Sequence, residues 1–268
     1  MSRLPFTFAC GSSQMAGTLD TAPASTGLLI VSGGSEIRSG AFRGQARIAA
    51  RIAAVGFPVM RFDRRGIGDS EGEDRGFRSS AKDIASALKA FRAIAPDLER
   101  VVGFGNCDAA AALMLHAADL GPEGFSGLVL ANPWTIEDEK DGADNTALPP
   151  ADAIVRRYAA KLGDRREIAR LLRGGVDLRK VRRGIAAMIG RPKSESALVE
   201  ELRTGWDAFE GRKTILLSGA DRTAQLFAAR WASNDPCIAH CEGAGHAFVK
   251  PAHFDWLEAR LLKALRGS

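Results

Sequence analysis

Residues 100–121 place a cysteine where the chain has to turn sharply. The apolar run RVVGFG ends in glycine, Asn106 and Cys107 follow, and an alanine-rich segment with helical periodicity begins at once. Cys107 therefore stands between a predicted strand and a predicted helix. Because the positive end of a helix dipole favours an anion, a thiol at this point is favoured as the nucleophilic thiolate. The alternative is a structural cysteine at the start of a helix.

The spacing around this cysteine is G-x-C-x-A, a variant of the nucleophile elbow G-x-S-x-G. The small residues two positions before and after it, Gly105 and Ala109, let the strand and the helix approach closely. The backbone N–H of Asp108 would then face the oxyanion that forms when a carbonyl group is attacked. We expect the Asp108 side chain to turn outward or to accept hydrogen bonds from N–H groups of the first helical turn.

A nucleophilic thiol needs a base, and the base needs a group that orients it. Asp221 comes just after a predicted strand at 213–218, and His246 lies in a glycine-flanked loop after a predicted strand at 237–241. Each of the other three histidines is predicted within a helix or strand or at the beginning of a helix: His116, His240 and His253. The sequence therefore predicts a catalytic triad of Cys107, His246 and Asp221.

Two glycine-rich segments follow predicted strands. Residues 31–40, VSGGSEIRSG, lack the G-K-[ST] of a phosphate-binding loop. We expect this segment to supply the second N–H of the oxyanion hole, from Gly34 or from the neighbouring Ser35. Residues 61–72, RFDRRGIGDSEG, have Glu71 where a dinucleotide-binding fingerprint needs its third glycine. Neither segment predicts a nucleotide cofactor.

The two cysteines near the C-terminus, Cys237 and Cys241, are predicted in one strand. Residues four apart in a strand are separated by roughly 13 Å, whereas a disulfide needs Cα atoms within about 7 Å. No second pair of ligands accompanies them, so the sequence predicts no metal site. Together with Cys10 and Cys107 they are expected to be reduced cysteines, which is typical of a cytoplasmic protein.

Short β-rich segments alternate with helical segments along most of the chain. After an N-terminal antiparallel hairpin around GSSQ, this alternation predicts a mostly parallel sheet with helices on both faces. The predicted parallel strands lie at 27–32, 57–62, 100–105, 127–132, 213–218 and 237–241, and predicted helices lie at 41–56, 79–94 and 107–121.

The alternation stops between the fourth and fifth of these strands. About 80 residues there show helical patterns without a convincing strand, and a structureless loop of that length is rare. We therefore predict a helical cap at 135–205, inserted into a core of residues 1–134 and 206–268, over the carboxyl ends of the strands. Residues 156–203 carry fourteen Lys and Arg against six Asp and Glu. This charge predicts either solvated basic helix faces or a lid that attracts an anionic substrate.

The composition of the 268 residues, 46% hydrophobic and 26% charged, is typical of a soluble globular protein. No apolar run approaches the ~20 residues that a membrane helix needs, and the N-terminus lacks the unbroken apolar region of a signal peptide. The net charge is +5, and basic residues are interleaved with acidic ones. No nucleic-acid motif is present, so no nucleic-acid partner is predicted.

Five segments resemble α/β-hydrolases in order along almost the whole chain: LLIVSGG, RFDRRGIGDSEG, GFGNCDAAA, SGADRTAQLF and GAGHAF. The chain order nucleophile, acid, histidine is that of the α/β-hydrolase fold. More narrowly, GGSEIRSGAFR, NCDAA and DRTAQ resemble the exosortase A system-associated hydrolase 1 group, named for genes near exopolysaccharide and protein-sorting loci. The chain departs from many α/β-hydrolases at Ser32, where relatives carry histidine, and at Ala109.

The residues and the resemblance together predict a hydrolase that cleaves an ester, thioester or lactone through an acyl-cysteine intermediate, with no metal or other cofactor. An acyltransferase that uses the same intermediate and a non-catalytic binding protein of this fold are the alternatives. The paired carboxylates that glycoside hydrolysis requires are not found in the sequence. The predicted partner is a small-molecule acyl substrate, and its acyl and leaving groups and the oligomeric state are left open.

Overall fold

The computed structural model describes residues 2–136, 197–231 and 235–267. The chain divides into two compact units, and the first consists of Met1–Thr135 and Leu198–Ser268. The predicted helical cap at 135–205 falls mostly on residues 137–196, which lie outside the described residues. The sheet and the candidate site lie in the first unit.

Eight strands form one sheet in the order β1-β2-β4-β3-β5-β6-β7-β8. The first two strands form the antiparallel hairpin predicted around GSSQ, and β2 also pairs antiparallel with β4. All the other neighbouring strands of this sheet are parallel, which confirms the predicted fold class. The strands are β1 Arg3–Cys10, β2 Ser13–Asp20, β3 Thr26–Val31, β4 Val59–Phe62, β5 Arg100–Asn106, β6 Gly127–Ala131, β7 Arg212–Ser218 and β8 Ile238–Cys241.

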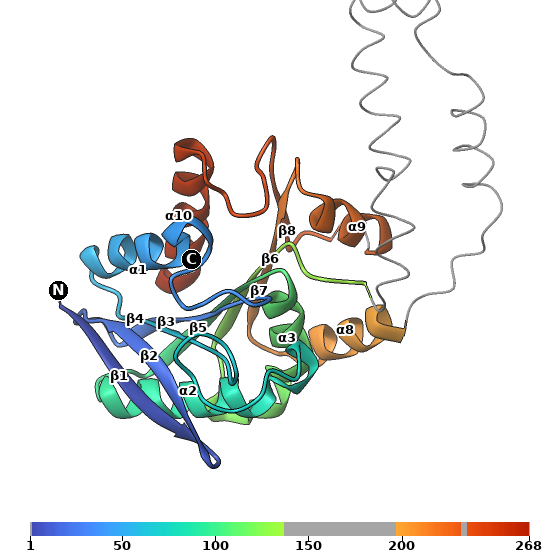
Figure 1. Cartoon of the computed structure of the whole chain (residues 1–268). Coiled ribbons are helices and arrows are strands. Elements are labelled where there is room, and N and C mark those ends of the chain that lie inside the picture. The colour runs from blue at the N-terminus through green and yellow to red at the C-terminus, as the bar shows by residue number, and fades with distance from the viewer. Residues whose placement is uncertain (1, 137–196, 232–234, 268) are drawn as a thin grey trace, which may run out of the picture. The chain divides into compact units, whose positions relative to one another are not determined.

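Helices cover both faces of this sheet (Figure 1). Because alternate residues of a strand point to opposite faces, each face has its own hydrophobic core. Leu28 and Ile30 of β3 pack on the face of α1 and α10, whereas Leu29 and Val31 pack on the face of the other helices. The helices are α1 Gly44–Ala54, α2 Ala81–Ile94, α3 Asp108–His116, α8 Ala197–Ala208, α9 Arg222–Arg230 and α10 Pro251–Arg266.

Helix α8 packs against the core, although the cap was predicted to extend to residue 205. Its apolar stripe is buried among side chains of the sheet and of α3, and the stripe consists of Leu198, Leu202 and Trp206. At Gly205 the helix lies directly on α3, because a Cβ there would overlap the carbonyl oxygen of Met114. The core unit therefore resumes at Leu198 rather than at residue 206.

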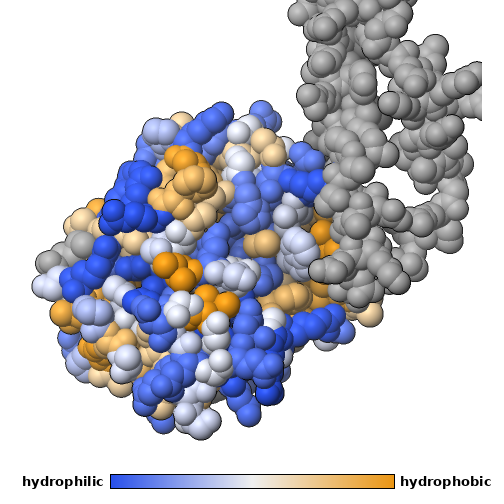
Figure 2. All heavy atoms as spheres, in the orientation of Figure 1, coloured by the Kyte–Doolittle hydropathy of each residue, from blue (hydrophilic) through white to orange (hydrophobic). Residues whose placement is uncertain are grey.

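The face of the core shown in Figure 2 is mostly hydrophilic, with hydrophobic residues in small, separate groups. Isolated apolar side chains of this kind are ordinary on a globular protein. Within the described ranges, no helix combines the length and the apolar character needed to cross a membrane. Large apolar side chains that are exposed in the described residues are Leu4, Ile37, Phe42, Val55 and Val249.

Replacing Gly205 should destabilise the contact between α8 and α3. We expect Gly205→Ala to lower the free energy of unfolding by about 1–3 kcal/mol, because the added methyl group would force the two backbones apart. Gly44→Ala is the matched control. A Cβ at Gly44 meets nothing within 4 Å, and its φ of −59° is helical, so it should change stability by no more than about 1 kcal/mol, in the stabilising direction. Urea unfolding measures both, and equal effects would contradict this packing.

Candidate active site

Cys107 occupies the turn between β5 and α3, with a φ of 64° and a ψ of −126°. Residues other than glycine rarely adopt a positive φ, so neighbouring contacts must hold this one in place. The Cys107 N–H donates to the carbonyl of Ala131 at 2.9 Å, and its carbonyl accepts the N–H of Trp134 at 3.2 Å. A Cβ at Gly105 would lie 2.7 Å from the carbonyl carbon and oxygen of Ala109. The strand and the helix thus approach as closely as an elbow requires.

Asp221 and His246 meet beyond the carboxyl ends of β7 and β8. His246 Nδ1 lies 3.0 Å from Asp221 Oδ2. The same carboxylate oxygen accepts the backbone N–H of Ala224 at 3.0 Å and so caps the N-terminus of α9. Because Asp221 is 8% exposed and this cap orients it, the carboxylate is held in position for the imidazole. The structure therefore brings together the acid and the histidine predicted from the sequence.

His246 also forms a side-chain hydrogen bond with Cys107. Because Nδ1 faces Asp221, the nitrogen that faces the thiol is Nε2. The hydrogen bond to Asp221 raises the pKa of His246 most, the hydrogen bond to Cys107 comes second, and burial opposes them, so that the pKa rises to about 10. His246 therefore carries a proton at neutral pH, with Cys107 on one side of the ring and Asp221 on the other.

The loop after β3 is tied to the start of α3 in a way that the sequence did not predict. The Gly34 N–H donates to Asp108 Oδ1 at 2.5 Å. Arg64 Nη2 donates to the Gly34 carbonyl at 2.5 Å and lies 3.4 Å from Asp108 Oδ2. The Arg64 side chain is 4% exposed, and a buried guanidinium needs an anionic partner. The expectation that Asp108 turns outward or bonds its own helix is therefore wrong.

This contact changes which N–H groups are free for an oxyanion. The Gly34 N–H, one predicted donor, is engaged by the Asp108 carboxylate. Within the described part of the chain, the backbone N–H groups of Ser35 and Asp108 have no hydrogen-bond partner. Ser35, the alternative that the sequence left open, therefore offers a free N–H next to Gly34. Gly33 lets this loop lie against the elbow, because a Cβ there would be 2.6 Å from the carbonyl oxygen of Asn106.

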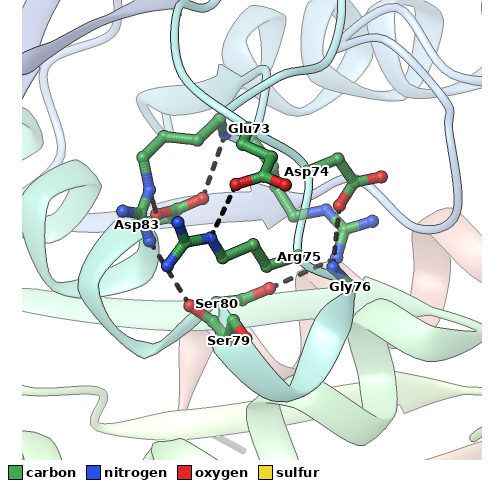
Figure 3. Close-up of a pocket in the computed structure, with 9 residues that line it drawn as sticks. Glu73, Asp74, Arg75, Gly76, Ser79, Ser80 and Asp83 are labelled. Carbon is green, nitrogen blue, oxygen red and sulfur yellow. Dashed lines mark hydrogen bonds and ion pairs between the residues drawn. The ribbon is translucent and has the colours of Figure 1, made fainter.

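Arg64 is one of the residues that line a small cavity, together with Ser80 and Asp83, which are labelled in Figure 3. Its volume of about 10 Å³ has room for roughly one water molecule, so it is too small for a substrate. Arg64 Nη1 donates to Ser80 Oγ at 3.2 Å, and the Arg65 N–H donates to Asp83 Oδ2 at 3.0 Å. These contacts hold the segment that carries Arg64 against the beginning of α2. The side chains around the cavity thus hold Arg64 in the position from which it binds the Gly34 carbonyl in the loop after β3.

Two of the four cysteines, Cys237 and Cys241, have thiols that are affected by burial. All four are unpaired, and burial raises the pKa of Cys237 and of Cys241. These two side chains are therefore neutral thiols at neutral pH. Among the described residues, no group of three or more His, Cys, Asp or Glu side chains is arranged to hold a metal ion.

Three polar residues near the site had no role assigned from the sequence: Arg64, Asn106 and Asn132. Arg64 follows β4 closely, Asn106 ends β5, and Asn132 follows β6 directly. A polar residue at the carboxyl end of an apolar parallel strand lies at the edge where open sheets build their sites. This signal was present in the sequence, although it does not identify the partners of these side chains.

The sheet topology and the elbow after β5 agree with the comparison with known families. A model of the alpha/beta hydrolase family matches residues 28–259. The chain belongs to the alpha/beta hydrolase family. No match is found among the curated proteins.

Solved structures of α/β-hydrolases resemble the chain along almost its whole length. A serine hydrolase of Xanthomonas campestris, described as lacking a lid, is 14% identical, with 99% of this chain and 94% of that chain covered and a TM-score of 0.58. A Pyrococcus furiosus esterase is 12% identical, with 99% of this chain and 92% of the esterase covered and a TM-score of 0.59. A proline iminopeptidase of Mycobacterium smegmatis is 16% identical, with coverages of 98% and 98% and a TM-score of 0.58. Likeness at this identity shows the fold alone.

The pKa of His246 should fall when either of its partners is removed. We expect Asp221→Asn to lower it further than Cys107→Ala does, because the bond to Asp221 is the larger cause. NMR titration of the imidazole resonances measures the change, and the signal that is missing in His246→Gln is assigned to His246. A wild-type His246 that titrates near its ordinary pKa of about 6.5 would contradict the arrangement.

The raised pKa also predicts how stability depends on pH. The protonated His246 stabilises the folded chain, and this stabilisation is complete below the pKa of about 6.5 that the histidine has in the unfolded chain. This stabilisation is lost as the pH rises through the folded value of about 10. The difference in unfolding free energy between the wild type and Asp221→Asn should therefore shrink between these two pH values, as urea unfolding at each pH would show. A difference that grows over this range would contradict the prediction.

The Asp108 carboxylate should protect the Gly34 amide from hydrogen exchange. We expect Asp108→Ala to speed this exchange by about 10- to 100-fold, because a hydrogen bond to a charged group contributes roughly 1.5–3 kcal/mol. The amide of Gly40 serves as the control, since it donates to the carbonyl of Ile37 at 2.8 Å in the same loop and should keep its rate. NMR-detected exchange measures both, and an unchanged rate at Gly34 would count against the bond.

Proposed function

We propose that this chain hydrolyses an ester, a thioester or a lactone by transferring the acyl group to Cys107. The observation that carries the proposal is the hydrogen-bonded series Asp221–His246–Cys107, in which Nδ1 and Oδ2 are 3.0 Å apart. A thiolate at a helix N-terminus is a strong nucleophile, and a protonated imidazole beside it can supply the proton that the leaving group needs.

In the first step, Cys107 Sγ attacks the substrate's carbonyl carbon. The resulting oxyanion accepts hydrogen bonds from the N–H groups of Asp108 and Ser35. The bond between the carbonyl carbon and the leaving group then breaks, and the leaving group takes the Nε2 proton of His246. The products are a thioester on Cys107 and a free alcohol or thiol, which for a lactone stays attached to the acyl chain.

In the second step, neutral His246 takes a proton from a water molecule while the oxygen of that water attacks the thioester. The bond between carbon and sulfur breaks, the acid departs, and Cys107 leaves as a thiolate beside protonated His246. The His246 side chain is 36% exposed, so water can reach it. Asp221 keeps the ring in one orientation and stabilises its positive charge throughout.

The substrate is proposed to be a small acyl compound. The esterase among the structural neighbours supports this choice, and the basic segment at 156–203, mostly outside the described residues, suggests an anionic substrate. Membership of the exosortase A system-associated hydrolase 1 group stays a prediction. The same holds for a cytoplasmic location, which the four unpaired cysteines support.

Intact-mass spectrometry after brief exposure to a p-nitrophenyl short-chain ester tests the proposal. We expect one acyl adduct on the wild type and none on Cys107→Ala. His246→Ala should form the adduct at least about 100-fold more slowly, since general acid–base catalysis contributes roughly 10²–10⁴ in rate. Cys237→Ala is the matched control and should acylate like the wild type.

The outcomes separate the three candidate functions. An adduct that persists in Cys107→Ala would contradict the proposed nucleophile. If an added acceptor alcohol speeds the breakdown of the adduct and becomes acylated, the protein is an acyltransferase instead. If the folded wild type forms no adduct and releases no nitrophenol with any acyl probe, and an anionic partner binds the wild type and Cys107→Ala equally well, the fold serves as a binding protein.

A further inference from the structure

Asn132 is a fully buried polar residue at the carboxyl edge of the sheet, directly after β6. Its φ is 46°, a left-handed conformation that asparagine tolerates better than most residues. Its backbone N–H continues the sheet by donating to the carbonyl of Leu216 at 2.9 Å. A buried amide is costly unless its polar groups are paired. The partners of this side chain therefore indicate what it holds together.

Every polar group of the Asn132 side chain is used. Oδ1 accepts the backbone N–H of Ser218 at 2.9 Å. Nδ2 donates to Asn106 Oδ1 at 2.9 Å and to the backbone carbonyl of His246 at 3.3 Å. Asn106 Nδ2 donates to the same His246 carbonyl at 3.2 Å. One main-chain oxygen of the histidine loop is thus bound by two asparagine side chains.

Each partner of Asn132 belongs to a segment that carries one member of the proposed triad. Asn106 is the residue before the nucleophile. Ser218 ends β7, and its carbonyl accepts the N–H of Asp221 at 3.1 Å. The third partner is His246 itself. A single buried side chain therefore connects three segments that are far apart in the sequence.

We infer that Asn132, assisted by Asn106, is a positioning residue that fixes the His246 imidazole relative to Cys107 and Asp221. The inference rests on the proposed function, because it concerns the geometry of that triad. Neither asparagine needs to touch the substrate, since both act through the backbone carbonyl of His246. A role limited to satisfying the ends of the strands would not require both side chains to donate to the same residue of the histidine loop.

Asn132→Asp tests this role with little change in shape. The new side chain still accepts the Ser218 N–H and tolerates the left-handed backbone, but it no longer offers both N–H donors to Asn106 and His246. Asn106→Ala removes one donor without adding a charge, so we expect it to lower the pKa of His246, measured by NMR titration, by about one unit, because the bond of His246 to Asp221 becomes less well aligned. The charge of a carboxylate at position 132 would by itself raise this pKa, so a fall in Asn132→Asp can come only from lost alignment.

Val129→Ala is the matched control, because Val129 lies on β6, which Asn132 follows directly, and is 1% exposed. This variant should lower stability and leave the pKa of His246 unchanged. A wild-type pKa of His246 in Asn106→Ala would overturn the positioning role. If Asn132→Asp does not fold, Asn106→Ala decides alone.

Acylation by the p-nitrophenyl ester, measured on the same samples, separates this inference from the function on which it rests. A wild type that acylates at Cys107, together with variants whose His246 titrates normally, overturns the positioning role alone. A wild type that does not acylate overturns the proposed function. A lowered pKa in the asparagine variants would still support the positioning of His246 in that case.

Discussion

The close approach of β5 to α3 determines where the proposed nucleophile lies and how the loops around it can pack. Only a residue without a side chain fits at Gly105, where a Cβ would lie 2.7 Å from the backbone of Ala109. This contact forces Cys107 into a turn with a φ of 64°. This conformation places the thiol at the N-terminus of α3 and beside His246. If β5 and α3 were farther apart, the thiol would contact neither the helix N-terminus nor His246.

The segment beyond the carboxyl ends of the strands supplies the second constraint, because backbone N–H groups at strand ends, in loops and at the start of a helix need partners there. Side chains accept these N–H groups. Asn132 accepts the N–H of Ser218, Asp221 accepts the N–H of Ala224, and Asp108 accepts the N–H of Gly34. The same hydrogen bonds fix the loops that carry the proposed triad and the oxyanion donors. The two carboxylates have separate cations, since Asp221 pairs with His246 and Asp108 with Arg64.

The sequence predicted the parts that depend on local patterns. Apolar runs identified the parallel strands, and the spacing around Cys107 identified the elbow, because both signals lie within a few residues. The pairing of Asp108 with Gly34 could not be predicted, because it depends on how closely the loop after β3 approaches the elbow. The partners of Asn132 likewise come from three distant segments. The packing of Leu198 and Leu202 in the core was missed because α8 directly follows a long segment of helical pattern.

The rate of Cys107 alkylation by iodoacetamide at neutral pH tests the claim that His246 activates Cys107, and it needs no substrate. Activation predicts that Cys107 reacts faster than Cys237, whose pKa is raised by burial. It also predicts that folded His246→Ala reacts at least about tenfold more slowly at Cys107, because the thiolate is the reactive form. Equal alkylation rates in the wild type and in His246→Ala would contradict the claim.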